Sequence, residues 1–424
     1  MSDPRVFPAV LTALAAFFLV QAATPLRLDS DSAKYLMMAA SMADGLGVPD
    51  TGFPRSYPYF LSLLDRAGIA TAATFVLANC VFIGLGLVAV WHLAARIPFA
   101  SPRWTVILTM LAVPVVRSIA MPLPEPSFFC ASLAALALMS RSREMAQPKR
   151  LLFLAFATLL VAVALSLRIS GLALIPPLIF SLFSVPGVSP ASVTVKWRLI
   201  AGTVAGLAIA LVVALAGLEE ARPIMNYLSM ARLGYAGRSL LTHFLQRTVN
   251  TLGALGELTG NVPTSQFDAL KHLYPWIGAI AVTVALRRGD SDRALSPIGV
   301  YLASYIGLLF LWPHYSTRLW MPVLPLLVAY ATAGAHHLAS KPAAAVALRA
   351  YVGWFCLTGL AALAYTTRIS FSGDRFPDRY GTAGGLATPG FEHENPGHNV
   401  EARRLLNRYG TKSQKAAPGV PPGS

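Results

Sequence analysis

Charged residues are scarce in this sequence, and acidic residues are the scarcest of them. Only 12% of the 424 residues are charged, and 19 Asp and Glu stand against 34 Lys and Arg. Hydrophobic residues make up 55% of the chain, and the mean hydropathy is +0.58. A soluble core cannot bury that much apolar surface, and runs that are continuous rather than alternating argue against a membrane β-barrel. The composition therefore predicts an all-α polytopic membrane protein.

Cysteine is also scarce, since the chain has three cysteines and neither a C-x-x-C motif nor a metal-ligand spacing. All three lie in apolar stretches, which favours small buried side chains over a disulfide or a metal site. The net charge of +15 would suggest nucleic acid in a soluble protein. Here the basic residues lie between apolar runs, where they set topology or contact lipid headgroups. We therefore expect no nucleic-acid partner.

The apolar runs predict about 11 transmembrane helices, within a range of about 10–13. These runs lie at 7–24, 70–95, 104–121, 126–140, 151–167, 171–184, 199–217, 274–287, 295–313, 319–337 and 346–366. The first run also has features of a signal peptide with a cleavage site near Ala22, although an uncleaved first span is favoured.

The short loops between these runs alternate between rich and poor in Lys and Arg, and the rich set is expected to be cytoplasmic. This places the N-terminus inside. The loops at 25–69 and 218–273 and the tail at 371–424 then lie outside, around one membrane domain at 1–370. The end of the tail, rich in Gly and Pro, is predicted to be disordered. A plasma or inner membrane protein with its functional face on the extracytoplasmic side is expected.

The loop after the first run opens with two aspartates in the stretch LRLDSDSAKYLMMAASMADGLG, residues 26–47. A helix is predicted over 32–43, with an apolar face that suits the membrane surface. Either Asp29 or Asp31 could cap this helix, and Asp29 could instead form an Asx turn. The other interpretation is a carboxylate pair that performs acid–base chemistry.

Three more outer turns carry ionisable groups, namely Glu125 in MPLPEPSFF, Arg168 in LSLRISGLALIPP, and His314 with Arg318 in WPHYSTRLWMP. Singly, each arginine could extend to lipid headgroups and the glutamate could be a solvated turn residue. Together they share one predicted face with the aspartates. Carboxylates and cations on one face suit a site that activates a hydroxyl and holds a phosphate.

The ordered series of motifs resembles the GT-C superfamily of integral membrane glycosyltransferases, in the branch of the protein O-mannosyltransferases and the lipid A aminoarabinose transferase. The family pattern D-[E/S]-x-x-Y-x-x-x-A corresponds to Asp31-Ser32-Ala33-Lys34-Tyr35 with Ala39. A P-E-P turn at 124–126, an R-x-x-G turn at 168–171 and an arginine before the late P-x-x-P at 322–325 follow in order. The chain departs from the pattern in having Ser32 after the aspartate, a leucine after Arg318 and no large outer domain after the last span.

The resemblance implies transfer of a sugar, with inversion, from a polyprenyl-phosphate donor to a hydroxyl on a lipid, glycan or protein acceptor. By family position Asp31 is the general base, Asp29 is the second choice or tunes Asp31, and Glu125 positions a reactant. The donor phosphate would be held by Arg318, with Arg168, Lys34, Arg55 and His314 as further candidates. Substrate-positioning or structural roles fall to Tyr35 and Tyr57. A divalent cation could bridge aspartate and phosphate, although nothing in the sequence requires one.

Two other functions fit a polytopic chain. A transporter or lipid flippase predicts ionisable residues near the middle of the membrane and broken spans in corresponding halves. The predicted spans contain little acid, which disfavours it. A non-catalytic membrane assembly subunit would tolerate the combined loss of Asp31, Glu125 and Arg318.

Overall fold

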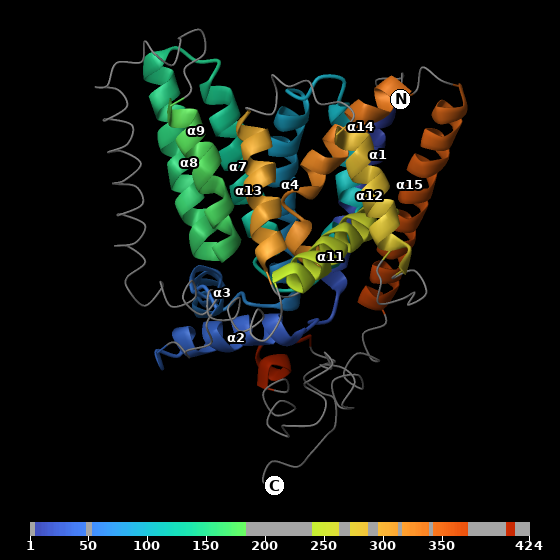
Figure 1. Cartoon of the computed structure of the whole chain (residues 1–424). Coiled ribbons are helices and arrows are strands. Elements are labelled where there is room, and N and C mark those ends of the chain that lie inside the picture. Colours follow the sequence, from blue (N-terminus) through green and yellow to red (C-terminus); the bar gives the residue numbers. More distant parts are fainter. Residues whose placement is uncertain are drawn as a thin grey trace. The chain divides into compact units, whose positions relative to one another are not determined.

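The computed structural model describes residues 5–47, 53–183, 240–262, 272–286, 296–312, 316–338, 342–371 and 404–411. Within these ranges all regular structure is helical (Figure 1). The chain divides into two compact units. Unit 1 comprises Met1–Val81, Val116–Pro126 and Leu360–Ser424, and unit 2 comprises Phe82–Val115 and Ser127–Gly359.

Unit 1 gathers the two ends of the chain and the first loop. Its elements are α1 (Val6–Val20), the 3-10 turn η1 (Gln21–Ala23), α2 (Ser30–Ala43), α3 (Ser56–Arg66), the start of α4 (Ala72–Ala94) and the end of α15 (Pro342–Phe371). A short helix at 404–409 also belongs to this unit.

Unit 2 holds most of the remaining helices. They are α5 (Pro102–Leu111), the start of α6 (Val113–Ile119), nearly all of α7 (Glu125–Ser142), α8 (Gln147–Leu167), η2 (Ile169–Leu174), α9 (Ile175–Phe183), α11 (Leu240–Gly260), α12 (Tyr274–Leu286), α13 (Pro297–Leu311), η6 (Thr317–Trp320) and α14 (Leu324–Leu338). Contacts join α11 to α12, α13 to α9 and α14 to α5.

Four helices in the described ranges are long and apolar enough to cross a membrane, at Val6–Ala23, Ala72–Ala94, Gln147–Leu167 and Ala345–Phe371. A fifth span would be the pair α5 and α6, which bends by 59° at a short break. Shorter apolar helices occur at Ile169–Phe183, Pro297–Leu311 and Leu324–Gly334. The all-helical prediction is confirmed, but the count of 11 spans is not, and the predicted span at 199–217 lies outside the described residues.

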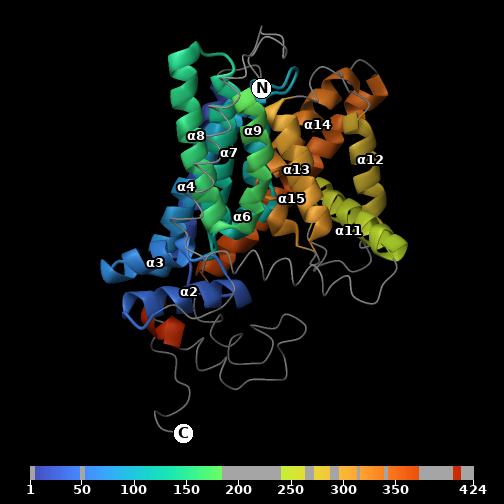
Figure 2. The same cartoon turned by 60° about the vertical axis from the view of Figure 1, so that its left-hand side comes forward.

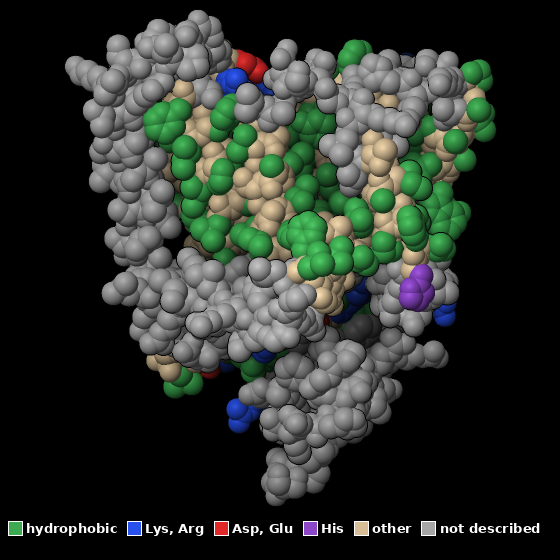
Figure 3. Space-filling view, viewed as in Figure 1, with side chains coloured by type: hydrophobic (Ala, Val, Ile, Leu, Met, Phe, Trp, Pro, Cys, Tyr) green, Lys and Arg blue, Asp and Glu red, His purple; other side chains and the backbone are tan. Residues whose placement is uncertain are grey.

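Hydrophobic side chains cover the outward face of unit 2 over α8, α9 and α13 (Figure 3). On α8, for example, Leu152, Phe156 and Leu159 keep 55%, 54% and 60% of their surface exposed. Exposed apolar side chains in such a continuous array match a lipid environment rather than water.

The break between α5 and α6 is closed by one side chain at the end of α11. Asn261 accepts a hydrogen bond from the Val113 amide at 2.8 Å and donates to the Leu111 carbonyl at 3.0 Å. It also donates to the Phe355 carbonyl at 3.0 Å. Backbone groups freed by a helix break must find partners when water is absent, and Asn261 supplies them. The residue has φ +55, which asparagine tolerates better than most side chains at a helix C-terminus.

The first loop folds as two packed helices, α2 and α3, which lie next to each other in both views (Figures 1 and 2). The sequence predicted 32–43 for α2, and the structure adds one short extension at the N-terminal end, to Ser30. The helix stops before Gly45, whose φ of +73 suits the left-handed residue that follows a helix end. The predicted apolar face is buried in protein rather than free for lipid. Its buried members are Tyr35, Leu36, Met38 and Ala39.

Candidate functional site

The two aspartates that follow α1 occupy different positions at the start of α2. Asp29 is the N-cap, and its Oδ1 accepts a hydrogen bond from the Ser32 amide at 2.7 Å. The Ser32 hydroxyl lies 2.6 Å from the Asp29 amide and accepts its hydrogen bond, which completes a capping box. Asp31 lies in the first turn and is half-buried. The sequence left open which aspartate caps the helix, and the structure gives that position to Asp29.

Aromatic rings connect α2 to the start of α3. The Tyr35 ring packs edge-on against Phe53 and Tyr57, with centroid distances of 5.1 Å and 5.5 Å. The Lys34 ammonium lies 5.3 Å from the Phe53 centroid, in a cation–π contact. Arg55 precedes α3 at its N-cap position and is half-buried. The structure therefore brings Lys34, Tyr35 and Tyr57 from two parts of the first loop into one cluster.

Glu125 is the first residue of α7 and is buried, with only 3% of its surface exposed. The turn before it is held by Asn79 of α4, whose side-chain nitrogen donates to three carbonyls, the last being that of Met121 at 2.8 Å. A carboxylate at a helix N-terminus is favoured by the helix dipole. Glu125 thus has a fixed place within unit 1.

Tyr57 connects Glu125 to the aromatic cluster electrostatically. Burial raises the pKa of the Tyr57 phenol well above its ordinary value of 10.0, and the negative charge of Glu125 and then Tyr35 raise it further. The phenol is only 2% exposed. Tyr57 therefore stays protonated and is a potential hydrogen-bond donor. It lies close enough to Glu125 for the charge of that carboxylate to act on the phenol.

Arg27 is a buried cation in the loop before Asp29 that sequence reasoning missed. It is 7% exposed and donates to the Thr24 hydroxyl, the Thr366 carbonyl and the Ser370 hydroxyl, each at 2.8 Å. Because two of these partners lie at the end of α15, Arg27 ties the loop that carries the aspartates to that helix. The contacts are far apart in sequence, so only the stretch "LRLD" beside the aspartates could have drawn attention to it.

The R-x-x-G turn of the motif series lies in unit 2 and has a steric reason for its glycine. Arg168 ends α8 in an extended conformation, and its carbonyl accepts from the Gly171 amide at 2.9 Å. A Cβ atom on Gly171 would lie 2.7 Å from the Leu165 amide nitrogen and 2.8 Å from the Ala164 carbonyl carbon. Only glycine allows the chain to turn back so closely onto α8.

Arg318 also lies in unit 2, half-buried on η6. The hydroxyl of its neighbour Thr317 donates to Glu257 of α11 at 3.2 Å, and Glu257 is 7% exposed. His314 lies outside the described residues.

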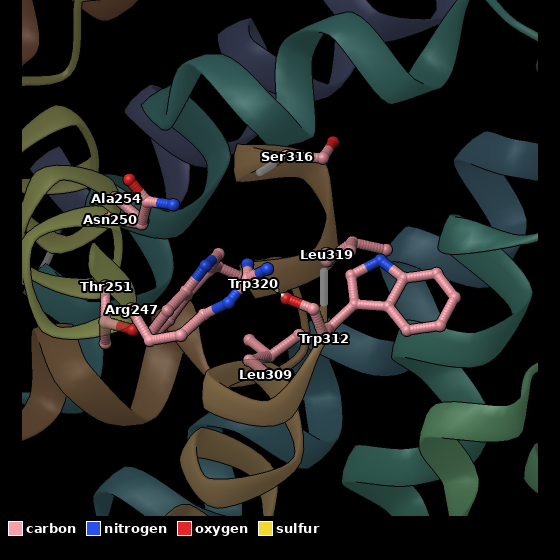
Figure 4. A pocket seen from close by; sticks show the side chains of 9 residues that line it. All are labelled: Arg247, Asn250, Thr251, Ala254, Leu309, Trp312, Ser316, Leu319 and Trp320. Atoms are coloured by element: carbon pink, nitrogen blue, oxygen red, sulfur yellow. Dashed lines mark hydrogen bonds between the residues drawn. The ribbon is translucent and has the colours of Figure 1, made fainter. Parts of the chain in front are cut away.

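A small hollow next to η6 has a buried cation on its wall (Figure 4). Arg247 of α11, which is 7% exposed, reaches toward the chain before η6 and donates to the Trp312 carbonyl at 2.7 Å. The indole of Trp312 extends away from Arg247 in this view. Such a mixture of cation, amide, hydroxyl and indole suits a hydroxylated or anionic ligand. The lining residues are Arg247, Asn250, Thr251, Ala254, Leu309, Trp312, Ser316, Leu319 and Trp320.

The predicted site residues thus divide between the two units. Unit 1 holds Asp29, Asp31, Lys34, Tyr35, Arg55, Tyr57 and Glu125, whereas unit 2 holds Arg168 and Arg318. Among the residues that the structure describes, no group of three or more His, Cys, Asp or Glu side chains is placed to hold a metal ion.

The sequence matches no protein-family model and no curated protein. Solved structures of the archaeal oligosaccharyltransferase from Archaeoglobus fulgidus are similar to the chain. AglB in complex with an inhibitory peptide and a dolichol-phosphate has 13% identity and a TM-score of 0.45, over 99% of this chain and 61% of that one. The apo form has 13% identity and a TM-score of 0.49, over 100% and 62% of the two chains.

A third structure, tethered by a disulfide to an acceptor peptide containing the NVT sequon, has 12% identity and a TM-score of 0.47 over 100% of this chain and 61% of that one. The chain therefore spans about three fifths of the length of these proteins. Likeness at this level of identity concerns the path of the chain and does not by itself carry an activity or a residue role from one protein to another.

Proposed function

We propose that the chain is a membrane glycosyltransferase that moves a sugar from a polyprenyl-phosphate donor to an acceptor hydroxyl on the extracytoplasmic face. The observation that supports it best is the cluster in unit 1. Asp31 and Tyr35 of the family motif share α2, Tyr35 packs on Tyr57, and the buried Glu125 acts electrostatically on Tyr57. Motif residues far apart in sequence therefore occupy one compact unit.

Asp31 is the proposed general base. Its carboxylate takes the proton of the acceptor hydroxyl as the hydroxyl oxygen forms a bond to the anomeric carbon. The bond from that carbon to the donor phosphate breaks on the opposite side, and its electron pair leaves with the polyprenyl phosphate. Attack on the side opposite the leaving group inverts the configuration at the anomeric carbon. Asp29 is the weaker candidate because its carboxylate already accepts a bond from the Ser32 amide.

Glu125 is proposed to position the acceptor together with Tyr57. A buried carboxylate accepts hydrogen bonds from sugar or alcohol hydroxyls strongly, because low-dielectric surroundings strengthen charged hydrogen bonds. The neutral phenol of Tyr57 is a donor in the same place. The pair can thus hold a hydroxyl group by one donated and one accepted bond.

Cations are needed to stabilise the departing phosphate. Unit 1 offers Lys34 on α2, beside the Phe53 ring, and Arg55 at the N-cap of α3. Arg318 and Arg168 of unit 2 are proposed from the family motifs, with His314 as a further candidate. Single substitutions of these cations should show which of them bind the donor phosphate, through their effect on the donor KM. The acceptor could be a lipid, a glycan or a protein.

The function is tested by reconstituting the purified protein into liposomes with a radiolabelled pool of polyprenyl-phosphate sugars and a membrane extract as the acceptor source. The matched control is the double variant Asp31→Asn with Glu125→Gln, checked for equal incorporation. We expect wild type, and not the variant, to move label from donor lipid to acceptor. Label that crosses the bilayer still attached to its lipid would mean a flippase instead. A wild type that leaves every donor unchanged and in place would mean a non-catalytic subunit.

A further inference from the structure

Residues 404–410, near the C-terminus, pack against the two helices of the first loop although more than 300 residues separate them in sequence. Arg408 forms two hydrogen bonds with the Asp44 carboxylate, both at 2.7 Å, at the end of α2. Its Nε also donates to the Asp65 carboxylate of α3 at 2.8 Å. One guanidinium therefore joins the C-terminal ends of α2 and α3.

Tyr409 adds a second polar connection and an apolar anchor to the same helices. Its hydroxyl donates to Asp65 at 2.8 Å, and its ring packs against Phe75 of α4 with a centroid distance of 5.9 Å. Tyr409 is 1% exposed, and its neighbours Leu405 and Leu406 are 3% and 5% exposed. Figures 1 and 2 both show this short helix against α2.

The Arg408–Asp44 pair is itself largely exposed, with 33% and 44% of the two side chains accessible, but it lies beside the buried side chains of Leu405, Leu406 and Tyr409. Exposed pairs contribute little, because water screens them and both side chains lose rotamer freedom. Here the buried side chains of the short helix hold the segment in place. The hydrogen bonds of Arg408 to its two carboxylates therefore do not have to offset the conformational entropy of the segment by themselves. The bidentate geometry also fixes the orientation of the guanidinium relative to the Asp44 carboxylate, which the ammonium of a lysine at this position would not do.

We propose that residues 404–410, the C-terminal clasp, hold α2 against α3, and that Arg408 is thereby a positioning residue for Asp31 and Tyr57. The positioning part of this inference rests on the proposed transferase function. The clasp acts at the C-terminal ends of α2 and α3, whereas Asp31 and Tyr57 lie in their first turns. Because both helices are rigid, a change in their packing at one end moves the side chains at the other. Displacements of about 1 Å far from the chemistry can cost about a hundredfold in rate.

The clasp is tested by comparing Arg408→Ala with Arg404→Ala in the full-length protein in detergent. Arg404 is exposed on the same short helix, so the control removes the same charge without the contacts. Hydrogen–deuterium exchange is measured on peptides from α2 and α3, and sugar transfer is measured in parallel. We expect Arg408→Ala to accelerate exchange in the last turns of α2 and α3 by about tenfold or more. We expect its kcat to fall by about tenfold while donor KM stays within about twofold.

Unchanged exchange in Arg408→Ala would overturn the clasp, and faster exchange with an unchanged kcat would overturn the positioning role. Should Arg408→Ala fail to fold, Tyr409→Phe retains the packing and removes one bond to Asp65, so the same exchange comparison applies with a smaller effect. If the wild type transfers no sugar, the proposed function fails, while the exchange pattern still decides whether the segment holds α2 to α3.

Discussion

The amide nitrogen of Ser32 lies 2.7 Å from Oδ1 of Asp29, and the two residues form a reciprocal capping box at the start of α2. This relationship separates the roles of the two aspartates. The carboxylate of Asp29 caps the N-terminus of the helix, while Asp31 follows within the first turn. Two acids of the same type, two positions apart, are thus a structural residue and a candidate base.

A substitution at Asp29 should act on stability. Asp29→Ala removes the cap and is expected to cost about 1 kcal/mol in unfolding free energy, whereas Asp29→Asn, also a good cap, should cost about 0.5 kcal/mol or less. The measurement is thermal unfolding in detergent, followed by circular dichroism. Equal losses in the two variants would show that charge, rather than capping, is what Asp29 contributes.

Tyr57 should resist ionisation. Burial first, and then the charge of Glu125, raise the pKa of the phenol above its ordinary value of 10.0. The neutral phenol therefore contributes stability that is complete below about pH 10 and lost as the pH rises toward the folded-state pKa. Absorbance at 295 nm, compared between wild type and Tyr57→Phe, should show no Tyr57 signal up to about pH 10. Glu125→Gln should lower the midpoint, and an unshifted midpoint would contradict the coupling.

Asn261 should be costly to lose. Asn261→Ala removes the partners of the Val113 amide and the Leu111 carbonyl, both at the break between α5 and α6. Buried backbone groups left unpaired cost about 1–3 kcal/mol each, so we expect a loss of about 2 kcal/mol or more. Asn250→Ala on the same helix is the matched control for thermal unfolding. Similar effects from both variants would mean that the break does not depend on Asn261.

The clasp should hold across ordinary pH. The hydrogen bonds from Arg408 lower the pKa of Asp44 below its ordinary value of 3.8, so this contribution is present above about pH 4 and lost as the pH falls. Burial and the bond to Asp65 raise the pKa of Tyr409, whose contribution declines only above about pH 10. A spin label on Asn407→Cys, in a background without the natural cysteines, should stay immobile between these limits and loosen below about pH 4. Loosening near pH 7 would contradict the ion pairs described here.

Local patterns predicted much of the fold. The sequence placed α2 within two residues of its observed start, because its capping residues, apolar spacing and the following glycines are all local signals. It also predicted one apolar run across α5 and α6 but not their bend. The backbone groups at the bend are paired by Asn261, which lies about 150 residues away and leaves no mark in the local pattern.

The sequence proposed residues for the candidate site but not their arrangement. The motif series identified Asp31, Tyr35 and Glu125, yet only the fold shows that Tyr57 connects the last two. Arg27 and Arg408 were missed, since each acts through partners more than 300 residues away in sequence. Pairings at that distance depend on tertiary packing, which single-sequence patterns do not encode.

The most direct test of the account is the single-turnover rate of sugar transfer in Asp31→Asn against Asp29→Asn, in proteoliposomes with saturating donor. The two variants carry the same chemical change two positions apart, and both keep α2 capped. We expect Asp31→Asn to lose transfer by about a hundredfold or more, as for a general base, while Asp29→Asn retains most of it. Equal rates in the two variants, or a larger loss in Asp29→Asn, would contradict Asp31 as the base.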